Sequence, residues 1–331
     1  MIGFTKSVAF IGILLMCLAA AGCGSSAKED MSSLGSISSE DGISSVYYSF
    51  EDDHGATVTL AKKPERIVVL TPQFLPMLYE LGGEAVGYAS SNSAIIPKGA
   101  EQVPQVGAVN EINVEQLTAL SPDLVIGSPT FDEKLIDLMN SNDIPLALLR
   151  MASFDDVKQK AGLIGKIIGA EEQAELIKRT EEKMDDIRGK LPPDRHTFAV
   201  LNVTTNSISI QRADTTALEI GELLNMTNIA KDMEPSPNSS TSAPYSIETL
   251  VAEQPDYIFI VIHGSEEKGM QKIQEDLEKN PAWASLQAVS EKRTHVLPAN
   301  QFLSNPGFDY ARSMEYMSKL IYPEIFGHVE P

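Results

Sequence analysis

The chain has 331 residues, with 46 Asp and Glu against 26 Lys and Arg, and a formal net charge of −20. This acidic balance argues against a nucleic acid partner and is typical of a well-solvated surface. Cys17 and Cys23 are the two cysteines, so the residues after them contain no disulfide and depend on an apolar core for stability.

The N-terminus has the features of an export signal. Residues 8–21 are apolar but too short to cross a bilayer, and Lys6 precedes them. The next residues, Ala20-Ala21-Gly22-Cys23, resemble a bacterial lipobox, in which the chain is cut before the cysteine and the cysteine is acylated. We therefore expect a lipoprotein signal peptide over residues 1–22, lipidation of Cys23, and attachment to the outer face of the cell membrane.

 A secretory signal without lipidation fits the same residues and remains the alternative.

The next segment, residues 23–48, is rich in Ser, Gly and acidic residues and predicts a flexible tether. Residues 49–150 then alternate short apolar runs with segments of helical spacing, which predicts an α/β lobe with a small parallel sheet. The predicted strands are 56–60, 66–70, 85–88 and 144–149, and the predicted helices are 76–81 and 131–141.

Residues 151–190 are predicted to form a helical connector. One helix is expected over 154–168, ending at Gly169, and a second, highly charged helix from 170 to about 190. At 1.5 Å per residue the second helix is about 30 Å long. A helical connector is stiffer than extended strands, so we expect a modest closure of the lobes.

Residues 191–331 repeat the α/β pattern and predict a second lobe. The predicted strands are 197–203, 257–262 and 294–297, and the predicted helices are 217–224, 266–279 and 309–321. The expected fold class is therefore α/β, with two lobes of small parallel sheets flanked by helices, joined by a single long connecting helix, and a ligand cleft between the lobes.

A segment that occurs twice supports the two-lobe prediction. Residues 112–126 read INVEQLTALSPDLVI and residues 245–259 read YSIETLVAEQPDYIF. At one constant offset, Glu115 matches Glu248, and a Leu, an Ala and a Pro-Asp pair also match. Each copy predicts a short helix, a turn and a buried strand, and a cleft between two such lobes is a place where small ligands bind.

These motifs resemble a known family. NVEQLTALSPDLVI, SIETLVAEQPDYIF and the connector motif IGKIIGAEEQAELI are similar to those of helical-backbone (class III) substrate-binding lipoproteins of ABC importers for iron chelates, heme and cobalamin. The resemblance implies a binding protein and not an enzyme, with an ABC permease dimer and its ATPase as partners. It also implies that Glu115 and Glu248 dock onto permease arginines. The alternative is that both are solvated acids at helix starts.

Two residues beyond predicted strands are candidate iron ligands. Met77 lies seven residues past the strand 66–70, near the start of the following helix, and His263 immediately follows the strand 257–262. TPQFLPMLYELG and IVIHGSEEKGMQKI also resemble the heme-binding lipoproteins of Gram-positive iron-regulated surface (Isd-type) uptake systems. That resemblance implies heme as the transported ligand, Met77 and His263 as its axial ligands, and cell-surface heme donor proteins as partners. The alternatives are a core methionine and a structural histidine.

Heme also requires apolar walls and cations near its propionates. Lys98 and Arg212 are the candidate propionate contacts, with ordinary surface charge as the alternative. The side chains expected to line the cleft are Phe74, Leu75, Ile95, Ile96, Phe131, Tyr245 and Phe302.

Other functions are less well supported by the sequence. A ferric siderophore is the main alternative ligand, but few arginines lie near the predicted cleft, namely Arg150 and Arg212. Cobalamin follows, since Trp283 is the single tryptophan and lies in a late segment. An enzyme is disfavoured because the chain has no nucleophile elbow, phosphate-binding glycine loop or metal-hydrolase spacing. A structural or adhesive lipoprotein would not need the paired glutamates.

Overall fold

The computed structural model describes residues 46–329, all of which belong to one compact unit. The expected signal peptide, Cys23 and nearly all of the expected tether lie outside the described residues. The tether was predicted to reach residue 48, but β1 already begins at Tyr48, so this boundary was too late. None of the helices within residues 46–329 is long and apolar enough to span a membrane.

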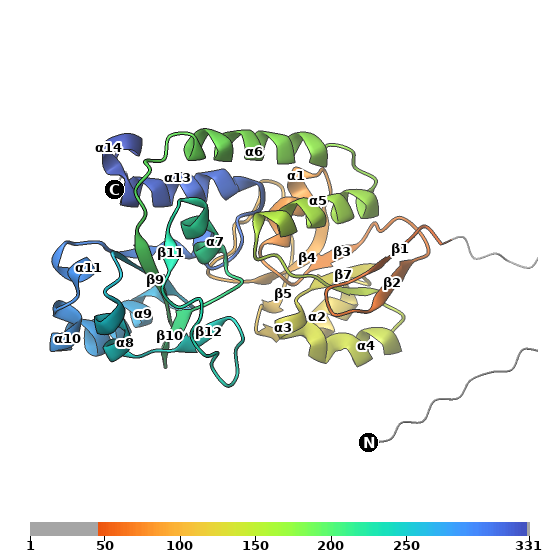
Figure 1. Ribbon diagram of the computed structural model, residues 1–331. Coiled ribbons are helices and arrows are strands. Elements are labelled where there is room, and N and C mark those ends of the chain that lie inside the picture. Colours follow the sequence, from red (N-terminus) through yellow and green to blue (C-terminus); the bar gives the residue numbers. More distant parts are fainter. Residues whose placement is uncertain (1–45, 330–331) are drawn as a thin grey trace, which may run out of the picture. The chain divides into compact units, whose positions relative to one another are not determined.

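The N-terminal lobe is built on a six-stranded sheet with the order β6-β5-β4-β3-β7-β8 (Figure 1). All neighbouring strands are parallel except β5 and β6. The sheet is therefore mixed, and only its β6 edge departs from the predicted parallel arrangement.

A separate hairpin, β1 (Tyr48–Glu51) and β2 (Thr57–Leu60), precedes this sheet. The strands are β3 (Ile67–Val69), β4 (Ala85–Ser90), β5 (Gln105–Ala108), β6 (Glu111–Ile112), β7 (Leu124–Gly127) and β8 (Leu146–Leu148). The helices are α1 (Phe74–Glu80), α2 (Val114–Ala119), α3 (Pro129–Asp132) and α4 (Ile136–Ser141), with a 3-10 turn η1 (Glu133–Leu135).

The C-terminal lobe has a second six-stranded sheet. Its order is β12-β10-β9-β13-β14, with β11 beside the start of β9. β13 is parallel to β9 and β14, whereas β10 is antiparallel to β9 and β12. The strands are β9 (Thr197–Val203), β10 (Ile208–Gln211), β11 (Thr227–Asn228), β12 (Ser242–Pro244), β13 (Tyr257–Ile262) and β14 (Thr294–Leu297). The helices are α7 (Thr216–Leu223), α8 (Ile247–Glu253), α9 (Glu266–Ile273), the π-helical η2 (Gln274–Glu278), α10 (Pro281–Ala284), α11 (Gln287–Ser290), α12 (Ala299–Phe302), η3 (Gly307–Asp309), α13 (Tyr310–Ile321) and α14 (Pro323–Phe326).

Two helices lead from the first lobe to the second. α5 (Phe154–Ile168) begins with a capping box at Ser153 and ends at Gly169, whose φ of 66° is left-handed. Such a conformation favours glycine and stops the helix. α6 (Gln173–Arg188) then passes to the C-terminal lobe and packs against α13, as Figure 1 shows. The predicted single connecting helix is confirmed, although it starts at Gln173 and not at residue 170.

The lobes share one apolar core on the side of the connecting helix. The largest cluster of buried residues joins Phe74 and Met77 of α1 to Phe302, Tyr310 and Met314 of the C-terminal lobe. α1 also contacts η3 directly. Because buried apolar area is the main stabilising term in folding, this shared core ties the two lobes together.

The repeated segment forms the same structure in both lobes. α2 precedes β7 and α8 precedes β13, and both strands lie inside their sheets. The Asp of each Pro-Asp pair fixes the start of a neighbouring strand. Asp123 Oδ1 accepts the Arg66 N–H at 2.8 Å, and Asp256 Oδ2 accepts the Thr197 N–H at 2.7 Å. The repeat therefore encodes a helix, a turn and a link to the adjacent parallel strand.

Candidate functional site

The loops that follow the parallel strands of the two lobes meet across a cleft. At one end, Asn92 after β4 donates its Nδ2 to the Gly264 carbonyl at 3.2 Å, and Ser93 Oγ lies 2.9 Å from Ser304 Oγ. At the other end, Thr216 Oγ1 of the C-terminal lobe donates to the Ala152 carbonyl at 3.1 Å. The carboxyl ends of strands thus face the space between the lobes, as is usual for ligand sites in α/β proteins.

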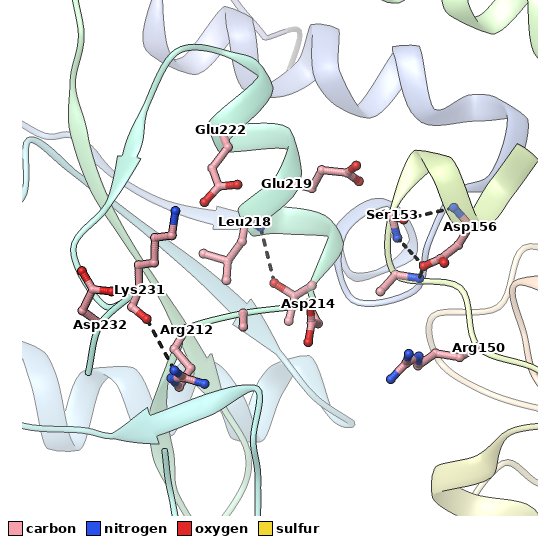
Figure 2. Close-up of a pocket in the computed structure, with 13 residues that line it drawn as sticks. Arg150, Ser153, Asp156, Arg212, Asp214, Leu218, Glu219, Glu222, Lys231 and Asp232 are labelled. Carbon is pink, nitrogen blue, oxygen red and sulfur yellow. Dashed lines mark hydrogen bonds between the residues drawn. The ribbon is translucent and has the colours of Figure 1, made fainter. Parts of the chain in front are cut away.

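A cavity of about 580 Å³ with many charged lining residues lies beside the second of these contacts. The β8–α5 loop forms one wall, and the segment around the start of α7 forms the other (Figure 2). The volume is in the range of small-molecule sites. The charged residues of its lining are Arg150, Asp156, Arg212, Asp214, Glu219, Glu222, Lys231 and Asp232.

Arg150 is an exposed cation in the lining of this cavity. Figure 2 shows its side chain extending from the β8–α5 loop toward the C-terminal lobe. The side chain is exposed, and its guanidinium makes no hydrogen bond or ion pair with another residue of the described range 46–329. A guanidinium with unused donors can bind a carboxylate through two parallel hydrogen bonds.

Arg212, an expected propionate contact, lines the same cavity but uses its donors within the protein. Its Nε donates to the Met233 carbonyl at 2.9 Å and its Nη1 to the Ser240 carbonyl at 2.7 Å. Arg212 thus holds the loop that carries Lys231, and its direct role toward a ligand is reduced.

Two of the cavity acids are also engaged. Asp156 accepts the N–H groups of Ala152 and Ser153 at 2.8 and 3.0 Å; although burial opposes the charge, these hydrogen bonds lower the pKa of its carboxyl. Glu219 accepts the Phe154 N–H at 2.9 Å and the Tyr310 hydroxyl, and burial raises its pKa. Both carboxyls therefore organise the cavity wall.

A second cavity, of about 810 Å³, lies at the Asn92 end of the cleft. It is lined by apolar side chains that include Met270 and Val296, which are 44% and 36% exposed. Asn92, Asn300 and Glu266 add polar groups. The two ends of the cleft thus differ in the number of charged side chains that line them.

His263 directly follows β13, as predicted, and is half-buried. Its Nε2 lies 3.1 Å from Asn202 Oδ1, which also accepts Gln211 Nε2 at 2.7 Å. Since an amide oxygen is only an acceptor, Nε2 carries the proton and the lone pair lies on Nδ1. Burial lowers the pKa of the imidazole, so it is neutral at pH 7.

The structure does not present Met77 to the cleft. Its side chain is 1% exposed and belongs to the core shared by the lobes. The reason is non-local, since residues of the C-terminal lobe belong to the same core as Met77. The expected pairing of Met77 with His263 is therefore not met in the described arrangement.

The residues expected to line the cleft are either packed in a core or exposed outside the two cavities. Phe74, Leu75 and Phe302 are at most 2% exposed and belong to the shared core, so they were wrongly expected at the cleft. Tyr245 packs on the core of the C-terminal lobe, where burial and then the charge of Glu248 raise its pKa to about 12. The exposed members are Ile95, Ile96, Phe131 and the cation Lys98, and none of them lines either cavity.

Glu115 and Glu248 occupy equivalent places. Each is exposed and is the second residue of its helix, after an Asn113 or Ser246 cap.

Within residues 46–329 no cluster of three or more His, Cys, Asp or Glu side chains is suited to hold a metal ion.

The sequence model of the periplasmic binding protein family matches residues 67–301. The chain belongs to this family. The Fe(3+)-citrate-binding protein YfmC of Bacillus subtilis is 27% identical to it over 298 residues, which cover 88% of the chain and 89% of YfmC. YvrC, an uncharacterized ABC transporter substrate-binding lipoprotein of the same species, is 25% identical over 95% of the chain and 96% of its own length.

The fold is also that of solved members. S. aureus IsdE complexed with heme aligns with a TM-score of 0.68 at 19% identity, over 78% of this chain and 98% of IsdE. This periplasmic binding protein is thus a substrate-binding protein of the ABC transporter type and not an enzyme, as the sequence predicted. Arg150 was noticed in the sequence but not chosen as a site residue. Its position directly after a buried strand was the signal that could have identified it.

Proposed function

We propose that this protein captures an anionic, carboxylate-bearing ferric chelate and delivers it to an ABC permease. The observation that carries the proposal is the free guanidinium of Arg150 in the inter-lobe cavity, with Lys231 on the opposite wall. An arginine binds a carboxylate with directional hydrogen bonds, and a lysine adds positive charge without fixing orientation. The likeness to the Fe(3+)-citrate-binding protein YfmC supports the same ligand class.

Heme is the second candidate, and His263 is the observation that favours it. A neutral imidazole directly after β13, with its lone pair on Nδ1, is a good iron ligand. The burial of Met77 weakens this candidate. His263 can bind iron through Nδ1 while its Nε2–H stays on Asn202, but ligation by Met77 requires that side chain to leave the shared core. The likeness to IsdE is one of fold and adds no ligand.

Two further roles are proposed from the sequence. Glu115 and Glu248, exposed at matching helix starts, would contact positive groups of a permease dimer with its ATPase, since charge complementarity sets register between partners. Acylated Cys23 would anchor the protein to the outer face of the membrane. Surface heme donors would be partners only if heme is the ligand.

A titration of the purified apo-protein tests the ligand class. Ferric citrate in excess citrate and hemin are added separately, and binding is followed by calorimetry and by the visible spectrum. We expect saturable binding of ferric citrate that is weakened by Arg150→Ala and, less strongly, by Arg150→Lys. Tight hemin binding with a His263-dependent Soret band, and no binding of ferric citrate, would instead establish the heme candidate.

A further inference from the structure

The position of Arg150 depends on a residue nearly a hundred positions earlier in the chain. Asp53 lies in the turn of the β1–β2 hairpin, and its Oδ2 accepts the backbone N–H of Arg150 at 2.7 Å. The Asp53 N–H donates to the Leu148 carbonyl at 2.9 Å. The hairpin turn thus holds both the end of β8 and the first residue of the loop that follows it.

Asp53 is itself held by a buried lysine. Lys160 on α5 places Nζ 2.6 Å from Asp53 Oδ1, and the two side chains are 9% and 26% exposed. Exposed ion pairs contribute little, but a buried lysine needs a partner because its charge has lost most of its water. One carboxylate therefore joins the hairpin, α5 and the Arg150 backbone.

The C-terminal lobe holds the residues that come next. Asn305 Nδ2 donates to the Ser153 carbonyl at 3.2 Å, and Glu219 accepts the Phe154 N–H at 2.9 Å. Thr216 donates to the Ala152 carbonyl. The segment 150–154 is therefore fixed at its far end by one lobe and at Arg150 by Asp53.

We propose that Asp53, oriented by Lys160, is a positioning residue for Arg150, so that the N-terminal hairpin sets the affinity of the cleft for anionic ligands. This inference rests on the proposed function in that Arg150 binds the ligand. Asp53 acts through the backbone, since its carboxylate is occupied by Lys160 and by the Arg150 N–H. A group that is fixed before binding loses less entropy when the ligand arrives.

The direction in which removal of Asp53 changes the affinity for an anionic ligand distinguishes a positioning role from a direct effect of its charge. Asp53 is an anion close to Arg150, so as a bare charge it would repel an anionic ligand, and its removal would tighten binding. As a positioning residue it has the opposite effect, and its removal would weaken binding. The two explanations therefore predict opposite changes in the same measurement.

The test measures ferric citrate binding by calorimetry for a double-mutant cycle. We expect Asp53→Ala to weaken binding about tenfold, the scale of one hydrogen bond involving a charged group. In the Arg150→Ala background it should have no further effect. Asp155→Ala is the matched control, because Asp155 forms an ion pair of the same 2.6 Å length with Lys158 on α5 but is exposed. Equal weakening in both backgrounds, or tighter binding, would overturn the proposal.

If Asp53→Ala does not fold, Asp53→Ala with Lys160→Met removes both charges and leaves no unpaired lysine. If the wild type does not bind ferric citrate, the proposed function fails, and nitrogen-15 relaxation of the Arg150 Nε–H in the apo-protein still reports on positioning. We expect a more mobile Arg150 side chain after Asp53→Ala and no change after Asp155→Ala. Unchanged mobility would refute the role of Asp53.

Discussion

Substitution of Met77 separates a packing role from iron ligation. Met77 is 1% exposed within the shared core, so Met77→Ala leaves a cavity in well-packed surroundings. Truncation of a buried methionine to alanine costs about 2–5 kcal/mol, because the lost transfer free energy adds to the cavity term. Met77→Leu keeps the volume and removes the sulfur, and such swaps cost less than about 1.5 kcal/mol.

The free energy of unfolding is measured for both variants by urea titration. We expect a large loss for Met77→Ala, a small loss for Met77→Leu, and unchanged ligand affinity for Met77→Leu. The reasoning would be refuted if Met77→Leu were as stable as the wild type and yet changed the spectrum of the hemin complex in both oxidation states. That result would show that the sulfur reaches the iron and that α1 moves on binding.

Three further predictions concern charge and attachment. Glu115→Ala with Glu248→Ala should leave ferric citrate affinity unchanged and reduce uptake by cells, since loss of a buried charged contact costs about 2–5 kcal/mol; normal uptake would exclude the docking role. Burial raises the pKa of Asp132 from 3.8 to about 6, so folding stability should fall by up to roughly 3 kcal/mol as the pH rises through this window, and Asp132→Asn should remove that dependence in urea titrations at pH 4 and 8. Cys23→Ala should release the protein from membranes or leave the signal uncut, and an unchanged mass in the membrane fraction would argue against lipidation.

Much of the fold could be predicted from the sequence because the residues that specify each element lie close together in the chain. Each repeated segment carries its own helix cap, turn and apolar strand, and Leu117 and Leu250 are both fully buried as the repeat requires. The Asp of each Pro-Asp pair then joins its strand to a neighbour. Breaks inside helices were harder to predict, since 266–279 was expected as one helix but changes to a π-helical turn after Ile273.

The candidate site could be predicted less well, because the residues that position it are far apart in the sequence. His263 directly follows β13, as the sequence predicted, but it lines neither of the two cavities, and its role as a ligand stays a prediction. Met77 could not be assigned to core or cleft, because its burial depends on residues of the C-terminal lobe that join the same core. Asp53 and the Arg150 N–H that it accepts are 97 residues apart, and no local sequence pattern predicts this hydrogen bond.

The core shared by the lobes has a consequence for ligand release. A hinge motion that parted Phe74 from Phe302 and Tyr310 would expose apolar surface to water, at about 2.5 kcal/mol for every 100 Å². Wide opening is therefore opposed in the resting protein, and we expect the cleft to keep nearly the same width whether it is empty or filled. We expect the ligand to leave when the permease displaces the loops at the rim of the cleft. The two lobes should move together as one rigid body during this step.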